Sequence, residues 1–311
     1  MINVLITGAS GFVGKNVLKY FLGRSKYSVC CILRRKVETY HDVEHIYLKN
    51  PELLSWKDYY KIIYDYDIST MIHIAAITGE RRISWEEYYK TNVLWTKNLA
   101  LSFAKSNVNH RNFIFFSSVG VYGTNPCNLP ADEHTPLNPD GFYHISKVMA
   151  EKELKSVSKH FDLPITIFRP TIMYGYYDYG FLYKISKLIK KNIFFIFSNP
   201  IIHLLDVWKV GYVCDIAIRK RKCGVYNLCD DMPTCLMDVV DFLSKIHQVK
   251  PYRMTKKICS ITKIIKNNIL KMKFKLLCYS WFYDNSKVRK DFGVSFGDTL
   301  ANLKKYISWY M

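Results

Sequence analysis

Short apolar runs alternate with longer amphipathic segments through the first half of the chain. The apolar runs are continuous, as strands buried on both faces are, and lie at 3–7, 28–33, 70–75 and 113–116. Segments with helical periodicity separate them, at 13–22, 56–64, 88–106 and 143–160. This alternation predicts the α/β class, a doubly wound parallel sheet with helices on both faces.

The alternation of predicted strands and helices is less regular in the second half of the chain. Two further strands are predicted, at 164–168 and 224–228. Helices and loops dominate the prediction elsewhere, over 176–202 and 232–311. We therefore expect a Rossmann-type domain at 1–170, which also receives the strand 224–228, and a smaller, mostly helical substrate-binding lobe at 171–311.

Composition narrows the class of protein. With 311 residues, 49% hydrophobic and 23% charged, the chain can bury a large core and is not disordered. Its first residues, MINVLIT, lead directly into a glycine turn and do not resemble a secretory signal. Nine cysteines occur without a CxxC pair or a His-rich partner, so neither a metal site nor a disulfide framework is indicated. We expect a cytoplasmic protein with reduced cysteines.

A glycine-rich turn follows the first predicted strand. It reads Thr-Gly-Ala-Ser-Gly-Phe-Val-Gly and occupies residues 7–14. Gly8 permits a tight exit from the strand, Gly11 lets the backbone approach a pyrophosphate, and Gly14 lets the helix pack closely. The N–H groups at the start of the next helix favour bound phosphate. The turn predicts a dinucleotide site formed by Gly8, Ser10, Gly11, Phe12, Val13 and Gly14.

The residues that follow the second strand bear on the choice of cofactor. About twenty residues after the glycines, an acidic residue commonly binds the adenosine ribose of NAD. This chain has Arg34 and Arg35 there, and guanidinium groups bind a 2′-phosphate well. The pattern favours NADP(H), whereas stacking of Arg34 on the adenine would also permit NAD(H).

Candidate catalytic groups lie just after the fourth predicted strand and on the helix that follows it. Tyr143 and Lys147 are four residues apart and share one helix face. We expect the ammonium to lower the pKa of the phenol, which makes it a better acid–base group. Ser118 follows the strand 113–116, where its hydroxyl can bind a substrate carbonyl beside the tyrosine.

Six stretches together resemble a known family. They are TGASGFVG at 7–14, MIHIAAITG at 71–79, TNVLWTKNL at 91–99, FIFFSSVGVYG at 113–123, YHISKVMAE at 143–151 and FRPTIMYG at 168–175. The chain resembles the extended short-chain dehydrogenase/reductases, the nucleotide-sugar epimerase/dehydratase/reductase superfamily, over nearly its whole length. The resemblance implies a catalytic trio of Ser118, Tyr143 and Lys147. It also implies cofactor contacts from Ala75, Ala76, Asn92, Tyr143, Lys147, Pro170 and Thr171.

The C-terminal part is similar to enzymes of surface-polysaccharide synthesis, which reduce 4-keto-6-deoxy UDP-sugars or epimerise at C4. The similarity lies in residues 176–191, 197–207 and 284–295. Pro200 and Ile201 depart from the arginines of that branch. Tyr174 would stack on the uracil or the sugar, with ordinary loop packing as the alternative. The implied substrate-binding residues are Thr78, Ser118, Tyr143, Tyr174 and Asn199.

These features predict an NADPH-dependent reductase of a nucleotide-linked, UDP-type 4-keto-6-deoxy sugar, working in surface-polysaccharide precursor synthesis. One alternative is a nucleotide-sugar 4-epimerase with tightly bound NAD, which would use the same trio. Another is a non-catalytic dinucleotide sensor or RNA-binding protein on the same fold. The expected partner is the nucleotide-sugar substrate, and a homodimer is left open.

The formal net charge of +19 is unevenly distributed. Residues 243–283 contain no Asp or Glu and ten Lys or Arg, a pattern that attracts polyanions or simply reflects a lysine-rich composition. Apolar residues at helical spacing over 256–277 would form a membrane-surface helix or cover the substrate lobe, and the resemblance favours the lobe. Nucleic acid and a membrane surface are therefore the less favoured partners.

Overall fold

The computed structural model describes residues 1–35, 43–78, 83–106, 112–253, 265 and 268–311. The chain forms two compact units, each built from three segments. Unit 1 comprises Met1–Val121, Asp140–Arg169 and Trp208–Tyr226. Unit 2 comprises Tyr122–Pro139, Pro170–Val207 and Asn227–Met311.

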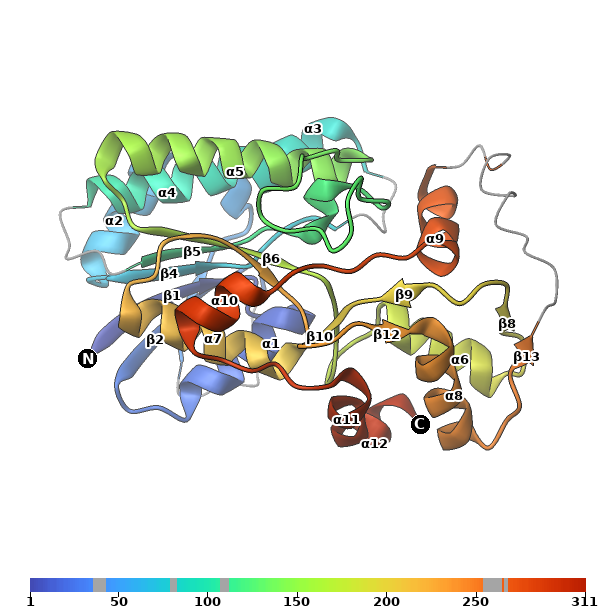
Figure 1. Cartoon of the computed structure of the whole chain (residues 1–311). Coiled ribbons are helices and arrows are strands. Elements are labelled where there is room, and N and C mark those ends of the chain that lie inside the picture. The colour runs from blue at the N-terminus through green and yellow to red at the C-terminus, as the bar shows by residue number, and fades with distance from the viewer. Residues whose placement is uncertain (36–42, 79–82, 107–111, 254–264, 266–267) are drawn as a thin grey trace. The chain divides into compact units, whose positions relative to one another are not determined.

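A seven-stranded sheet forms the centre of unit 1 (Figure 1). Its strand order is β11-β6-β5-β4-β1-β2-β3. The pairs from β6 through to β3 are all parallel, as the apolar runs predict. In chain order the strands are β1 (Ile2–Thr7), β2 (Tyr27–Leu33), β3 (Glu44–Tyr47), β4 (Thr70–His73), β5 (Asn112–Phe116), β6 (Ile165–Pro170) and β11 (Gly224–Leu228).

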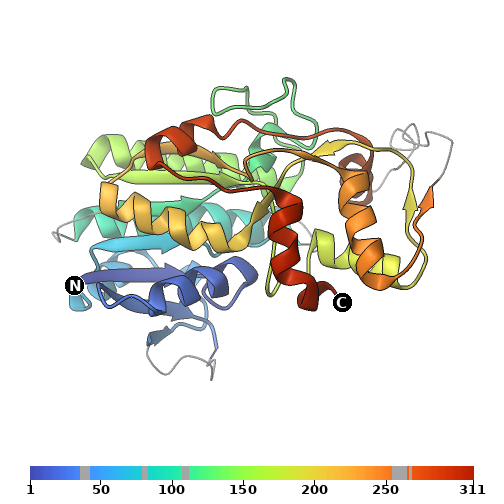
Figure 2. The same cartoon turned by 60° about the horizontal axis from the view of Figure 1, so that its bottom comes forward.

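Helices cover both faces of this sheet. Figures 1 and 2 show α2, α4 and α5 over one face and α1 and α7 over the other. Their bounds are α1 (Phe12–Leu22), α2 (Trp56–Asp65), α4 (Trp95–Lys105), α5 (Phe142–Phe161) and α7 (Val207–Lys220), with the short α3 (Trp85–Tyr88) beside α5. A buried apolar cluster joins α2, α4 and α5 to the sheet, and includes Tyr59, Leu99, Phe103, Phe113 and Leu154. Burial of these side chains stabilises the layer arrangement.

The helices α1 and α7 pack closely because one position between them carries no side chain. A Cβ atom added at Gly211 would lie 2.5 Å from Cβ of Tyr20. The rings of Trp208 and Tyr212 also contact the Tyr20 ring, at centroid separations of 6.1 and 6.5 Å. This side of unit 1 is therefore fixed by aromatic packing around one tyrosine.

Unit 2 consists of helices and very short strand pairs. The strands are β7 (Ile172–Tyr174) with β10 (Leu204–Asp206), β9 (Ile201–Ile202) with β12 (Thr234–Cys235), and β8 (Phe195–Ile196) with β13 (Tyr252–Arg253). The helices are α6 (Phe181–Lys190), α8 (Leu236–His247), α9 (Asn268–Cys278), α10 (Ser286–Phe292), α11 (Thr299–Leu303) and α12 (Ile307–Tyr310). Helices α6 and α8 pack against each other.

The predicted fold class is confirmed. Strands β1, β2, β5 and β6 and helices α1, α2 and α5 begin and end within two residues of the predicted bounds. The hydrophobic pattern does not predict β3, because all four of its side chains are exposed or half-buried. Half of the predicted 256–277 helix lies outside the described residues, and α9 covers its last ten residues. Within the part of the chain that the structure describes, no helix could span a membrane and no cluster of His, Cys, Asp or Glu could hold a metal ion.

Candidate active site

The chain reverses direction across the sheet between β1 and β4. These strands are neighbours, but the chain leaves β1 toward β2 and leaves β4 toward β5, on opposite sides. In open α/β sheets, ligands bind outside the carboxyl ends of the strands at such a switch point. The glycine loop follows β1 there, and residues 74–78 follow β4.

The three glycines of the loop meet different constraints. Gly8 has φ +77°, and a Cβ there would lie 2.7 Å from the Ala75 backbone nitrogen. A Cβ at Gly14 would lie 2.0 Å from the Gly8 carbonyl oxygen. At Gly11 the nearest atom is the Gly8 oxygen at 3.4 Å, so the protein itself leaves room for a side chain. Because Gly11 has no side chain, the space on the outer side of the loop stays open.

The start of α1 suits a bound phosphate. Its N-cap is Gly11, which provides no side chain to cap the helix, and its first turn has no acidic residue. The first N–H groups of α1 are therefore not engaged by a capping side chain. An anion with oxygens to accept these N–H groups fits this loop, as the pyrophosphate of a dinucleotide would.

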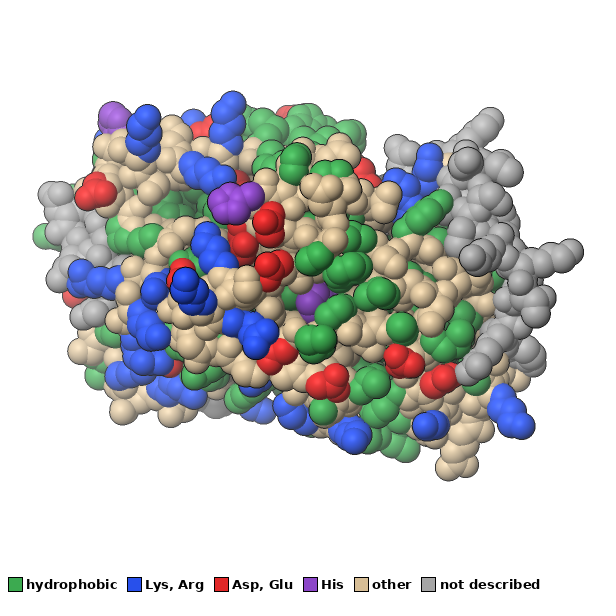
Figure 3. Space-filling model, in the orientation of Figure 1, with side chains coloured by type: hydrophobic (Ala, Val, Ile, Leu, Met, Phe, Trp, Pro, Cys, Tyr) green, Lys and Arg blue, Asp and Glu red, His purple; other side chains and the backbone are tan. Residues whose placement is uncertain are grey.

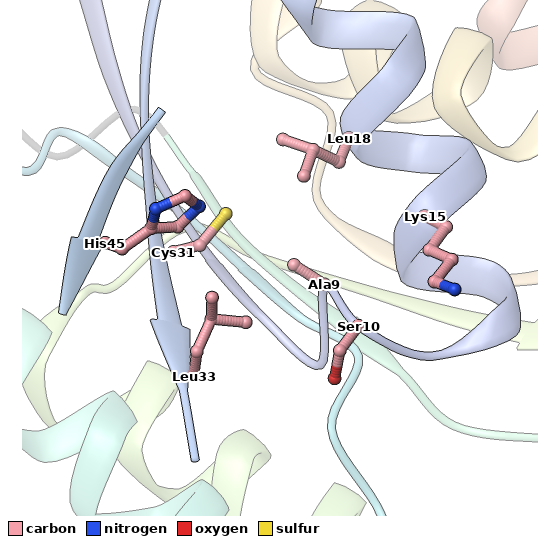
Figure 4. Close-up of a pocket in the computed structure, with 7 residues that line it drawn as sticks. All are labelled: Ala9, Ser10, Lys15, Leu18, Cys31, Leu33 and His45. Carbon is pink, nitrogen blue, oxygen red and sulfur yellow. The ribbon is translucent and has the colours of Figure 1, made fainter. Parts of the chain in front are cut away.

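A hollow lies between the glycine loop and strands β2 and β3 (Figure 4). It is lined by Ala9, Ser10, Lys15, Leu18, Cys31, Leu33 and His45. Among the described residues, Nε2 of His45 is a buried polar atom without a hydrogen-bond partner. The hollow is mostly apolar and adjoins the glycine loop, but its volume of about 10 Å³ is too small for the adenosine half of a dinucleotide unless its lining side chains move.

Arg34 directly follows β2, and its guanidinium is engaged by an acid. Its Nη2 lies 3.0 Å from Oε2 of Glu52, which belongs to the short helix Pro51–Leu53. Arg34 is half-exposed, so this pair is worth little in stability. Its effect is on recognition, because the carboxylate would repel a 2′-phosphate that Arg34 alone would attract. The sequence pattern alone gave no role to Glu52.

A buried histidine connects the carboxyl ends of β1 and β4. His73 Nδ1 lies 2.7 Å from the Thr7 hydroxyl, and its Nε2 lies 2.9 Å from the Thr96 hydroxyl. Burial, and secondarily the charge of Lys147, lower the pKa of His73 to about 3. The imidazole is therefore neutral, and its hydrogen bonds fix the loop after β4 relative to the glycine loop.

The predicted trio converges beyond the end of β5. Tyr143 and Lys147 lie in the first two turns of α5, with the ammonium 5.9 Å from the centre of the phenol ring. A hydrogen bond joins Tyr143 to Ser118, whose hydroxyl also accepts from the Gly120 N–H at 3.0 Å. Tyr143 and Ser118 are half-buried and accessible, whereas Lys147 is buried and donates to the Phe116 carbonyl at 2.7 Å.

The protonation states of the trio differ from the sequence expectation. Burial raises the pKa of Tyr143 to about 12, although its hydrogen bond with Ser118 lowers it. Burial also lowers the pKa of Lys147 to about 7, and the nearby Glu151 carboxylate opposes this shift. The expectation that Lys147 lowers the pKa of Tyr143 is therefore wrong. Desolvation is the largest cause of both pKa shifts.

A buried ion pair joins α5, the helix that carries Tyr143 and Lys147, to strand β6. Both Glu151 and Arg169 have side chains that are only 2% exposed, and Nη2 of Arg169 donates to Oε2 of Glu151 at 2.6 Å. Nε of Arg169 and the Ser117 hydroxyl both donate to Oε1 of Glu151, at 2.9 and 2.6 Å. The sequence analysis assigned no role to these three residues. The sequence feature that could have pointed to them is the position of Glu151, which lies four residues after Lys147 on the same helix face.

Asn92 lies in a π-helical turn, Tyr89–Leu94, and is almost fully buried. Its amide accepts from the Ile77 N–H at 2.8 Å and donates to the Ile77 carbonyl and the Ser146 hydroxyl, both at 2.9 Å. This amide thus links the loop after β4 to α5. In that loop Ala75 and Ala76 are half-buried, while Thr78 is exposed and its carbonyl accepts from Tyr88.

The remaining predicted residues lie in unit 2. Tyr174 is fully buried, and its hydroxyl donates to Asp230 at 2.7 Å, as loop and core packing would require. Thr171, next to Pro170, donates to the His203 carbonyl at 2.6 Å. Asn199 is exposed, and its amide oxygen accepts from the Met237 N–H in the first turn of α8. Contacts of these four residues with cofactor or substrate stay predictions.

The glycine loop makes a direct prediction. Gly11→Val should fold normally, because the protein leaves room for a side chain, but should lose dinucleotide binding by at least tenfold, because the side chain fills the phosphate space. Gly14→Ala should instead destabilise the fold, because its Cβ meets backbone at 2.0 Å. Fluorescence titration with NADH, together with thermal unfolding, distinguishes these outcomes. Normal binding by folded Gly11→Val would show that the loop does not hold phosphate.

The buried ammonium makes a second prediction. In ¹³C and ¹⁵N lysine spectra, one signal should titrate near pH 7 instead of the ordinary 10.5, and should be missing in Lys147→Met. Glu151→Gln should lower this midpoint further, because the carboxylate favours the ammonium. Glu153 lies on α5 like Glu151, but it pairs with Lys97 of α4. Glu153→Gln should therefore leave the titration midpoint of Lys147 unchanged. Titration of every lysine above pH 9 would contradict the assignment.

Curated proteins with related sequences include sugar epimerases and dehydratases. An Escherichia coli O157:H7 protein, N-acetyl-alpha-D-glucosaminyl-diphospho-ditrans,octacis-undecaprenol 4-epimerase, is 30% identical over 190 residues, 60% of this chain and 54% of its own. A UDP-glucose 4-epimerase from Pasteurella multocida is 25% identical over 292 residues, covering 81% and 85%. The chain spans between about half and three-fifths of the length of the first three curated relatives.

Solved structures agree on the fold. UDP-glucuronic acid 4-epimerase from Bacillus cereus, in complex with NAD, superposes with a TM-score of 0.79 at 19% identity, over 99% of this chain and 98% of that one. At this identity the likeness shows the fold alone. The family model matches residues 4–200, which include the glycine loop and the trio. The chain belongs to the NAD dependent epimerase/dehydratase family.

Proposed function

We propose that the protein is an NAD-dependent 4-epimerase of a sugar activated by a diphosphate, with a nucleotide sugar as the expected substrate. The observation that carries the proposal is the juxtaposition of Ser118, Tyr143 and Lys147 beyond the end of β5, at the same sheet edge as the glycine loop. Once deprotonated to the phenolate, an accessible tyrosine held by a serine hydroxyl can take a proton from a sugar hydroxyl and later return it.

The roles of the side chains follow from their contacts. Tyr143 would exchange the proton of the C4 hydroxyl, and Ser118 would donate a hydrogen bond to the C4 oxygen once it becomes a carbonyl. Lys147 would favour the phenolate when its ammonium is charged. NAD in the glycine loop would supply the redox chemistry, accepting hydrogen from C4 and giving it back.

Return of hydrogen to the opposite face of the sugar inverts C4 without net oxidation. Such a reaction does not consume the dinucleotide, so it has no need of an NADPH supply. The ion pair between Arg34 and Glu52 supports NAD as the cofactor, because it weakens the predicted binding of Arg34 to the 2′-phosphate of NADP. The description of the family and the 4-epimerase relatives support it as well. The reductase prediction relied on Arg34 and loses that support.

Turnover of UDP-sugars tests the proposal. Purified protein is incubated with UDP-glucose and UDP-N-acetylglucosamine in D₂O, and the C4 epimers are followed by NMR. Epimerisation without added dinucleotide and without deuterium at C4 is the expected result. Consumption of NADPH with a UDP-4-keto-6-deoxy sugar, and no epimerisation, would favour the reductase instead.

Tyr143→Phe should reduce epimerisation by at least ~10²-fold, the usual contribution of general acid–base catalysis, because it lacks the exchangeable proton. Its content of bound NAD should stay near that of wild type. Tyr64→Phe, which removes an exposed hydroxyl on α2, is the matched control and should keep full activity. Retention of more than a tenth of kcat by Tyr143→Phe would remove this residue from the acid–base role.

Cofactor preference tests the Arg34–Glu52 pair. Wild type should bind NADH more tightly than NADPH. Glu52→Gln should improve NADPH affinity by about ten- to a hundredfold, since it frees Arg34 to bind the 2′-phosphate and removes a repelling charge. Glu44→Gln, which neutralises an exposed acid on β3, should leave NADPH affinity unchanged. Tighter binding of NADPH than of NADH by wild type would overturn the NAD assignment.

A further inference from the structure

Positive charge is concentrated on the α1–α7 side of unit 1. Residues 1–34, which include β1, α1 and β2, contain five Lys or Arg and no Asp or Glu. Residues 208–224, which include most of α7, contain another five and one acid, Asp215. We call the surface of these two segments the basic face. Its cations on and after the helices are Lys15, Lys19, Arg24, Lys26, Lys209, Arg219, Lys220, Arg221 and Lys222.

The single acid of the basic face is buried and faces inward. Asp215 is 4% exposed and accepts from the Tyr20 and Tyr27 hydroxyls. It also pairs with Lys26 at 2.9 Å and Arg219 at 3.3 Å, whose side chains stay 44% exposed. Asp215 therefore orients two cations without presenting its own charge to an approaching anion.

Two exposed aromatic side chains lie among these cations. Trp208 and Tyr212 are 41% and 37% exposed and are one turn apart on α7, in line with Arg219 two turns further on. The Arg24 guanidinium packs over the Tyr20 ring that supports both aromatics, at 3.5 Å from its centre. Figure 3 shows Lys and Arg side chains where Figure 1 draws α7, and Figure 2 shows α1 and α7 side by side.

We propose that the basic face docks the protein on the surface of an anionic lipid bilayer. Lysine and arginine attract anionic headgroups, and exposed tryptophan and tyrosine favour the interface, where a ring can be apolar at one end and wet at the other. A pair of adjacent helices can lie flat on such a surface. A nucleic acid is the other polyanion that such a surface could attract, and the test below distinguishes it from a bilayer.

Vesicle sedimentation tests this proposal with the full chain. Wild type should bind vesicles of phosphatidylcholine mixed with phosphatidylglycerol, but not of phosphatidylcholine alone, and added salt should weaken binding. Each surface cation is worth roughly fivefold in affinity, so Lys19→Gln with Lys220→Gln should bind about 25-fold more weakly. Lys61→Gln with Lys152→Gln is the matched control, because it removes the same charge from exposed positions on α2 and α5.

Further measurements separate docking from folding and catalysis. Both double variants should unfold at the wild-type temperature and epimerise soluble UDP-sugars at the wild-type rate, because neither touches the candidate active site. The tryptophan emission of wild type should shift to shorter wavelength on anionic vesicles, and Trp208→Phe should lose most of this shift.

Three results would overturn the proposal. One is no binding of wild type to anionic vesicles at low salt. Another is equal loss of binding in the control variant, which would mean that net charge alone acts. The third is tighter binding of single-stranded RNA than of vesicles, with Lys19→Gln and Lys220→Gln affecting mainly the RNA, which would assign the face to nucleic acid. None of these results depends on the proposed epimerase activity.

Discussion

The ion pair between Glu151 and Arg169 is the constraint on which the candidate active site depends. Removing two charges from water costs several kcal/mol each, and a buried pair persists only if hydrogen bonds satisfy both partners. Here Glu151 accepts from Arg169 twice and from Ser117 once. The pair joins α5 to the ends of β5 and β6, so the helix that bears Tyr143 and Lys147 has one favourable position on the sheet. Loss of either partner leaves a charge buried alone, at about 3–5 kcal/mol.

The same burial that orders the site also disfavours the charged forms of Tyr143 and Lys147. Tyr143 stays protonated and Lys147 tends toward the neutral amine, because desolvation disfavours both charged forms. Glu151 is the near negative charge that favours the ammonium. Any positive charge that a bound ligand adds beside Tyr143 would favour the phenolate. Readiness for proton transfer is thus coupled to ligand binding, rather than built into the protein alone.

The parts predictable from sequence are those that depend on local pattern. Buried parallel strands are continuous apolar runs, so β1, β2 and β5 stand out, and the glycine loop is defined by its spacing. The strand β3 was hidden because its side chains are not buried, and the short strands of unit 2 are too brief to show a period. Glu151, Arg169 and Glu52 were missed for another reason. A charged residue in a helix, in a turn or near the end of a strand resembles a solvated position until tertiary contacts show its partner.

Unit 1 is completed late along the chain. Its segments are separated by two insertions of unit 2, and its edge strand β11 ends at Leu228. A ribosome that has made β1 to β6 has therefore produced a sheet that still lacks β11 and the covering helix α7. Until then the apolar face that α7 covers and one edge of β6 remain open to wrong partners. Vectorial synthesis should consequently leave that face uncovered until β11 has emerged, and neither unit can be transplanted into another protein as a continuous piece.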